Sequence, residues 1–202
     1  MEWRSWTTSR RCLPIEAKRC AIPVMNADPT EKYTFETFRF EGDDETPNNP
    51  RLPLVVYRSV VPDQAVDDAA GWLERTFARN GWSDGWRNGI YPFLHFHTGT
   101  HEVLGIARGR ATVEFGGAEG RPLAVAAGDV VVLPAGTGHK RLDASTNLLV
   151  VGAYPRNGQF DQKRPGEVDS EVARRSVAAV PLPEKDPVLG ARGPVIDLWR
   201  TK

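Results

Sequence analysis

The chain has 202 residues, enough for one domain of ordinary size with terminal extensions and few for two domains. Lysine plus arginine and aspartate plus glutamate each total 26, so no basic excess is available to bind nucleic acid or an anionic membrane. The longest apolar runs are far below the roughly 20 residues of a membrane-spanning helix, which favours a cytoplasmic protein.

The first 30 residues differ in composition from the rest of the chain. Both cysteines, Cys12 and Cys20, lie here, and two cysteines define no disulfide framework. The segment is rich in arginine and lacks the continuous apolar stretch of a secretory signal. We expect residues 1–30 to form a disordered extension, with Met25 near the start of the folded domain.

The first regular elements follow this extension. Residues 33–40 carry aromatic side chains at alternate positions with one slip, which predicts a strand, and the apolar residues 52–57 predict a second strand. Between residues 63 and 80 apolar residues recur every three or four positions, which predicts a helix over 63–80. The apolar face of this helix is formed by Val66, Ala69, Ala70, Leu73 and Phe77.

After the helix the pattern changes to short apolar runs separated by glycines. Several short strands with regular turns are typical of an all-β sandwich or barrel. We therefore expect residues 31–155 to form one all-β domain that includes the helix. Residues 156–202 are rich in proline, glycine and charge, and we expect an irregular tail that packs on the barrel through its few apolar residues.

The histidines are concentrated in one place. The chain has four, and three of them lie between residues 95 and 101. On a strand, His95 and His97 project from the same face. Thr98–Thr100 can break the strand phase so that Glu102 supplies an oxygen, and His139 can close the site from a neighbouring strand. Imidazoles with one carboxylate suit a transition metal better than Ca²⁺ or Mg²⁺.

Two segments resemble the motifs of the cupin superfamily. Gly89, His95-x-His97, Glu102 and Gly109 have the spacing of the first motif, and Gly128, Pro134-x-Gly136 and His139 that of the second. Asp143 stands where the second motif ends in asparagine. Strings such as Trp86-Arg87-Asn88-Gly89-Ile90-Tyr91 and Val151-Gly152-Ala153-Tyr154-Pro155 are similar to the YjlB-like bacterial cupins over most of residues 34–199.

This resemblance implies an all-β double-stranded β-helix, a jelly-roll barrel with one helix in its N-terminal half and irregular terminal extensions. It also implies one divalent transition metal (Fe, Mn, Ni, Zn or Cu) held by His95, His97, Glu102 and His139. Because adjacent residues on a strand face opposite ways, either Glu102 or His101 is a ligand, and the spacing favours Glu102. Cupins are often dimers, so we expect a homodimer.

Strand alternation adds candidates around the metal. If His139 points inward, Arg141 and Asp143 should do so too, and Phe93 and Tyr91 should follow His95. Arg141 is then a catalytic candidate that clamps a substrate carboxylate, or it forms an ion pair with Asp143 or Glu114. Tyr91 is a second candidate, although aromatic residues commonly line a barrel. Trp72, Trp82 and Trp86 are interpreted as core residues.

The function follows from the ligand set that the resemblance implies. Four protein ligands leave positions on the ion for dioxygen or substrate. The first hypothesis is a metal-dependent enzyme that acts on a small organic acid or enol, with dioxygenase chemistry ahead of isomerase or decarboxylase chemistry. The alternative is a non-catalytic protein that binds or senses a small molecule and uses the metal structurally.

Overall fold

The computed structural model describes residues 33–200, so the predictions for the N-terminal extension and Met25 lie outside the described residues. The strands are β1 (Thr34–Phe38), β2 (Leu54–Arg58), β3 (Trp82–Asn88), β4 (Glu102–Arg108), β5 (Arg110–Phe115), β6 (Arg121–Ala126), β7 (Val130–Leu133), β8 (His139–Ala144) and β9 (Leu149–Pro155). The helices are α1 (Ala69–Arg79), α2 (Ser170–Ala179) and α3 (Pro194–Trp199), with short 3₁₀ segments η1 (Asp63–Asp68) and η2 (Gly117–Glu119).

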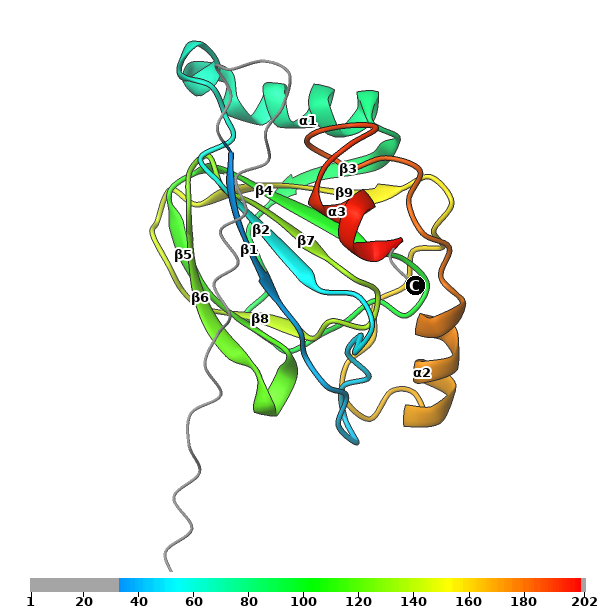
Figure 1. The fold of residues 1–202 in the computed structure, drawn as a ribbon. Helices are drawn as coiled ribbons and strands as arrows, with labels where there is room; N and C mark the ends of the chain where they lie inside the picture. Colours follow the sequence, from blue (N-terminus) through cyan, green and yellow to red (C-terminus); the bar gives the residue numbers. More distant parts are fainter. Residues whose placement is uncertain (1–32, 201–202) are drawn as a thin grey trace, which may run out of the picture.

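The strands form two antiparallel sheets that enclose a core (Figure 1). The larger sheet has the order β1-β2-β7-β4-β9-β3, and the smaller sheet has the order β6-β5-β8. Neighbours in the sheets are mostly distant in sequence, as in a jelly roll. The predicted all-β cupin jelly roll is confirmed. Within residues 33–200, no helix is long and apolar enough to cross a membrane.

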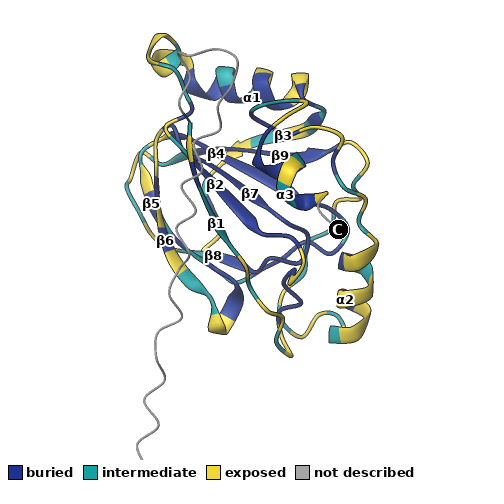
Figure 2. Cartoon of the chain, in the orientation of Figure 1, coloured by how far each residue is buried: buried dark blue, intermediate teal, exposed yellow. Residues whose placement is uncertain are grey.

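The larger sheet is covered on both faces. In β2, Leu54 and Val56 point into the inner core between the sheets, whereas Val55 and Tyr57 point into an outer core shared with α1 and the C-terminal segment. Alternate side chains on a strand face opposite ways, so a strand between two cores is apolar throughout. Figure 2 shows the central strands of the larger sheet, β2, β7, β4 and β9, as a buried layer, whereas the edge strands β1 and β3 and the outer faces of the helices are partly exposed.

The slip among the N-terminal aromatics marks a change of face. Phe35 belongs to the outer core, whereas Phe38 and Phe40 pack against the inner core. Residues an even number of positions apart share a face of a strand, as Phe38 and Phe40 do, whereas Phe35 and Phe38 are three positions apart and lie on opposite faces. The aromatics of this edge strand therefore contribute to both cores.

The predicted helix over residues 63–80 is only partly correct. Residues 63–68 form the 3₁₀ segment η1, and α1 begins after Asp68, whose side chain accepts a hydrogen bond from Gly71 N at 3.2 Å. Val66 is 59% exposed, while Leu73 and Phe77 are buried. Because a 3₁₀ helix has three residues per turn, η1 does not continue the apolar face of α1.

The sequence suggested an irregular C-terminal segment. This prediction was only partly correct, because the segment contains α2 and α3. The Asp169 side chain caps α2 by accepting from Glu171 N and Val172 N, both at 3.0 Å. Trp199 at the end of α3 enters the outer core, where its Nε1 donates to Pro53 O at 2.9 Å. Capping and tertiary packing offset the poor helix propensity of the flanking sequence.

One buried carboxylate connects this segment to the sheet. Asp186 accepts hydrogen bonds from the backbone N–H groups of Val188 at 2.9 Å, Leu189 at 3.0 Å and Val195 at 3.2 Å. The hydroxyl of Tyr57, on β2, donates to the same carboxylate. Asp186 therefore holds the turn before α3 against the outer face of the larger sheet.

Candidate metal centre

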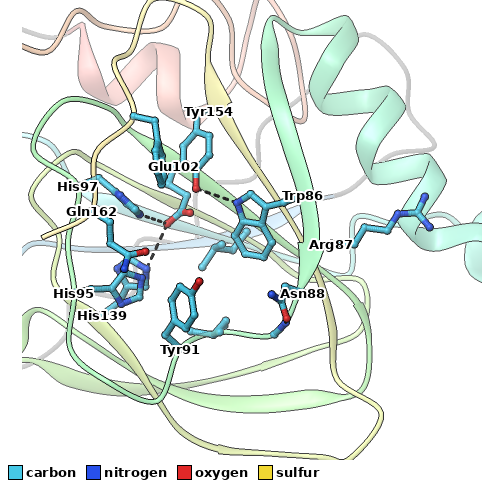
Figure 3. A pocket seen from close by; sticks show the side chains of 14 residues that line it. Trp86, Arg87, Asn88, Tyr91, His95, His97, Glu102, His139, Tyr154 and Gln162 are labelled. Atoms are coloured by element: carbon cyan, nitrogen blue, oxygen red, sulfur yellow. Dashed lines mark hydrogen bonds and ion pairs between the residues drawn. The ribbon is translucent and has the colours of Figure 1, made fainter. Parts of the chain in front are cut away.

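Three buried histidines converge at one end of the inner core. His95 and His139 form an isolated β-bridge, with His95 N donating to His139 O at 3.2 Å and His139 N to His95 O at 2.9 Å. His97 lies two residues further along the same extended segment. One ring nitrogen from each histidine lies within 4.8 Å of those of the other two (Figure 3).

Backbone carbonyls fix the orientation of all three rings. Nδ1 of His95, His97 and His139 lies against the carbonyl oxygens of Phe93, Asp161 and Thr137, respectively. A carbonyl oxygen only accepts, so each Nδ1 carries the proton and each Nε2 keeps its lone pair. Histidine ligands of metals are commonly oriented in this way.

Glu102 joins the histidines and His101 does not. The Glu102 Oε2 atom lies 3.4 Å from Nε2 of both His97 and His139. Glu102 begins β4 in the same phase as Leu104, which faces the inner core. His101 faces the other way, with its ring 4.7 Å from that of Trp199.

Two atoms of this cluster point to a metal ion. Nε2 of His97 and Oε2 of Glu102 are buried, and neither makes a hydrogen bond. Buried polar atoms almost always have partners, so this pair needs an explanation. Ligands bound at about 2.1 Å lie roughly 3.0–3.4 Å apart in one coordination shell, which matches the spacing around Glu102. The residues fit a divalent transition metal.

The electrostatics of the cluster keep the carboxylate charged. Burial alone would raise the pKa of Glu102, but His97 and His139 outweigh it and hold this pKa well below its usual range. Burial lowers the pKa of His97, but the Glu102 carboxylate outweighs it and the pKa is raised. Burial and the neighbouring His139 lower the pKa of His95 to about 3, so this imidazole stays neutral. A metal ion competes with protons for these groups.

A cavity of about 220 Å³ opens beside the cluster (Figure 3). Its remaining side chains are mostly aromatic or aliphatic. They come from β3 and the residues after it, from β4, from β9 and from the segment that follows β9. The cavity residues are Trp86, Arg87, Asn88, Gly89, Ile90, Tyr91, His95, His97, Glu102, Leu104, His139, Tyr154, Phe160 and Gln162.

Arg141 does not line this cavity, which corrects the expectation from strand alternation. It lines a neighbouring surface hollow that shares Asn88 and Gly89 with the cavity, and its guanidinium lies beside Gly89. Arg141 N donates to Tyr91 O at 2.8 Å, so its long side chain starts beside Tyr91 and ends at Gly89 instead of at the histidines. Asp143 is also displaced, because the register between β5 and β8 shifts between Arg141 and Asp143.

The alternative ion pairs expected for Arg141 are also absent among residues 33–200. Asp143 is exposed and has no ion pair with Arg141, and Glu114 binds Lys140 instead, at 2.9 Å. A catalytic role for Arg141 therefore has no support in the position of its side chain.

Tyr91 does line the cavity, at its mouth. It is 46% exposed, and its ring stacks on that of Phe93 with centroids 4.7 Å apart. The same ring lies edge-on to His95 at 5.4 Å. Alternation thus predicted the shared face of Tyr91, Phe93 and His95, and a catalytic role for Tyr91 stays a prediction.

Sequence reasoning missed the wall formed by Trp86 and Tyr154. Trp86 Nε1 donates to the Tyr154 hydroxyl at 2.9 Å, and its ring lies flat against Gly152 of β9. A Cβ at Gly152 would come within 2.2 Å of the indole, so only glycine leaves room for it. Burial and the charge of Glu102 raise the pKa of Tyr154 far above its usual range. The pairing of β3 with β9 was not readable from the sequence.

The described fold and cluster define a class of protein, a cupin with a histidine site able to bind a metal ion. No protein-family model matches the chain. The uncharacterised protein YjlB of Bacillus subtilis is 39% identical over 164 residues, which are 81% of this chain and 96% of YjlB. The chain belongs to the YjlB family.

The chain is also similar to solved structures at low identity. A Bacillus subtilis oxalate decarboxylase is 15% identical, with a TM-score of 0.33 over 70% of this chain. A DMSP lyase structure is 16% identical, with a TM-score of 0.30 over 65% of this chain. The chain spans 29% of the decarboxylase chain and 52% of the lyase chain.

Proposed function

We propose that the protein is a metal-dependent enzyme that acts on a small organic acid or enol, with dioxygenase chemistry the first candidate. His95, His97 and His139 would hold a divalent transition metal, together with Glu102. The observation that carries this proposal is a pair of buried atoms without a hydrogen bond, His97 Nε2 and Glu102 Oε2, in two residues that line the cavity.

The cavity favours catalysis over a structural metal. Structural sites are closed by protein ligands, whereas catalytic sites keep a position open to substrate. Here His95, His97, Glu102 and His139 all line the same cavity, so a ligand in the cavity reaches them. In the non-catalytic alternative, a binding or sensor protein uses the same cavity for its ligand and the metal as a structural element.

The bound metal would supply Lewis-acid activation of an oxygen donor or redox chemistry with O₂, and a dioxygenase adds both oxygen atoms to its substrate. The chain's own residues would position the substrate and exclude water. Trp86 and Leu104 give apolar surface, and the Tyr154 hydroxyl, which accepts from Trp86 Nε1, would donate a hydrogen bond to a substrate oxygen.

Elemental analysis of protein purified without chelators tests the metal site. We expect about one equivalent of a transition metal, as four converging ligands imply, and its loss in His95→Ala and His139→Ala. His101→Gln is the matched control, because His101 is a buried histidine outside the cluster. No metal in the parent after reconstitution, or equal loss in the control, would contradict the site.

Activity is tested separately on the metal-loaded protein. We expect oxygen uptake with members of a panel of small organic acids and enols, lost in His139→Ala. Full metal loading with neither oxygen uptake nor any product would favour the non-catalytic alternative. The homodimer and the cytoplasmic location stay predictions, and light scattering of the purified protein tests the first.

A further inference from the structure

The cavity beside the histidines offers no free cation among the described residues. Arg87 is the one arginine or lysine in its lining, and its guanidinium donates to both carboxylate oxygens of Glu74 at 2.6 Å. In Figure 3 the Arg87 side chain extends away from the cavity towards α1. A second carboxylate on a ligand would therefore find no partner in the cavity.

The lining and size of the cavity suit a compact apolar body. Trp86, Tyr154 and Phe160 provide aromatic surface, and Ile90 and Leu104 provide aliphatic surface. The volume is about 220 Å³, and an apolar protein cavity of about 150 Å³ is enough to bind benzene. The space thus holds one ring with a small head group, and it falls below the roughly 300–1,000 Å³ of pockets for larger ligands.

We propose that the ligand is a single-ring, or similarly compact apolar, monocarboxylate or enol, with its oxygen head towards the metal and its body against Trp86. This deepens and rests on the proposed function, because the head group needs the metal. A dicarboxylate is disfavoured, since its second charge would be desolvated in an apolar cavity without a counter-ion. Specificity then comes from the aromatic wall.

Titration of the Co²⁺-loaded protein with benzoate, acetate and succinate tests this, with the visible cobalt spectrum as the readout. Burial of a ring predicts that benzoate binds about 10-fold or more tightly than acetate, which has the head group alone. We expect succinate to bind no better than acetate. Equal affinity for the three acids, tighter binding of succinate, or no binding of benzoate overturns the proposal.

Two variants test whether the cavity lining, and not a general loss of structure, determines benzoate binding. Ile90→Phe adds bulk at the cavity and should weaken benzoate binding about 10-fold or more, while acetate binding and metal content stay unchanged. Arg141→Ala removes the arginine that strand alternation placed near the metal. Because its side chain lies outside the cavity, this change should leave benzoate binding unchanged. Loss of benzoate binding in Arg141→Ala overturns the proposal. Loss of the metal itself in the parent contradicts the proposed function instead.

A separate observation concerns residues 159–163, which cross over the histidine segment. The Asp161 carboxylate accepts from Thr98 N at 2.8 Å, Gly99 N at 2.9 Å and the Thr98 hydroxyl at 2.7 Å. The carbonyl oxygen of the same Asp161 accepts from His97 Nδ1. One residue therefore holds both the segment and the ring of a metal-cluster histidine.

The crossing depends on a close approach of two backbones. Gln159 N donates to Gly99 O at 2.8 Å, and Phe96 and Lys163 exchange two backbone hydrogen bonds, each of 2.9 Å. A Cβ at Gly99 would lie 2.3 Å from Gln159 O, so glycine is required there. This pairing brings Phe160 and Gln162 to the cavity.

We infer that Asp161 is a positioning residue for the metal site: its side chain docks residues 159–163, and its carbonyl orients His97. Loss of the side chain frees the carbonyl to move away from the ring. Residues that hydrogen-bond metal ligands typically change metal affinity about 10- to 100-fold when mutated, and Asp161→Ala should weaken binding by that range.

Competition titrations with Zn²⁺ and the cobalt spectrum test this inference. Asp161→Asn keeps Oδ1 as the acceptor for both N–H groups and should recover most of the affinity. Asp169→Ala is the matched control, because Asp169 also caps backbone N–H groups in the C-terminal segment but does not contact His97. We expect parent-like affinity and spectrum in this control.

If Asp161→Ala lowers the Tm but leaves zinc affinity and the cobalt spectrum unchanged, Asp161 is only structural and the inference is overturned. If Asp161→Ala does not fold, Thr98→Val replaces it, since it removes one of the three hydrogen bonds to the carboxylate. Thr98→Val should then weaken metal binding by less than 10-fold, and no change would contradict the inference.

Discussion

Two buried carboxylates, Glu102 and Asp186, lie on opposite sides of the larger sheet and have opposite surroundings. Asp186 accepts four hydrogen bonds, from Tyr57 and three backbone N–H groups, and burial raises its pKa. Glu102 faces imidazole nitrogens, its Oε2 has no hydrogen bond, and its pKa is lowered. A satisfied buried carboxylate stabilises the fold, whereas an unsatisfied one indicates a missing ligand.

The largest expected effect is on stability, at Asp186. Asp186→Ala removes the acceptor of four buried donors, and each unpaired donor costs about 1–3 kcal/mol, so we expect a loss of about 3 kcal/mol or more. Urea unfolding of the metal-free protein measures this. Metal stoichiometry should not change in the fraction that folds, and a loss below about 1 kcal/mol would contradict the structural role of Asp186.

The matching change at Glu102 should act mainly on metal affinity. Glu102→Gln removes the charged oxygen, and because substitutions beyond the ligands already cost about 10- to 100-fold, we expect a loss of about 100-fold or more in metal affinity. The metal-free protein should also lose stability, because His97 and His139 favour a charged side chain at this position, but by less than in Asp186→Ala. Parent-like metal affinity in Glu102→Gln would remove Glu102 from the site.

Metal addition should then distinguish the two carboxylates in one measurement. An ion that binds only the folded state stabilises it by about 2.7 kcal/mol at a concentration 100 times its Kd. We expect this gain in the parent and in the folded fraction of Asp186→Ala, and little gain in Glu102→Gln at the same concentration. A parent whose Tm does not respond to any first-row transition metal would contradict the comparison.

A smaller effect is expected at the donor to Asp186. Tyr57→Phe removes one hydroxyl of the four donors and keeps the ring in the outer core, so we expect a loss of about 1–2 kcal/mol. Urea unfolding against the parent measures it. A loss as large as that of Asp186→Ala would mean that Tyr57, and not the backbone donors, dominates this contact.

The smallest effect is expected at Arg141. Its side chain lies outside the cavity, so Arg141→Ala should change metal affinity by less than about 2-fold and unfolding free energy by about 0.5 kcal/mol or less. Isothermal titration with Zn²⁺ and urea unfolding check both values. A large loss of metal affinity would contradict the position of Arg141 outside the metal cluster.

The part of the site that could be predicted is local in sequence. His95 and His97 share a face because alternate residues on a strand do so, and the same rule separates Glu102 from His101. The helix boundary failed because η1 and α1 have different periods. The predicted place of Arg141 in the cavity was wrong because alternation gives the face of a strand but not where a long side chain ends, here beside Gly89.

The rest of the cavity is made by contacts between distant segments. Trp86 reaches Tyr154 only because β3 pairs with β9, and nothing in either segment specifies that partner. Residues 159–163 dock on Thr98 and Gly99 through hydrogen bonds across some 60 residues of chain, and an aspartate in a proline-rich and glycine-rich stretch has many other possible roles. Helix α2 depended on a cap at Asp169 that the prediction overlooked.

By itself the sequence determined an all-β barrel and a cluster of three histidines, because strand alternation and motif spacing are local and survive any arrangement of the loops. Only the tertiary structure decided which arginines stay outside the cavity and which side chains form its wall. These features depend on which strands pair and where two backbones approach closely. Such contacts join residues far apart in the chain, and no periodic pattern in the sequence marks them.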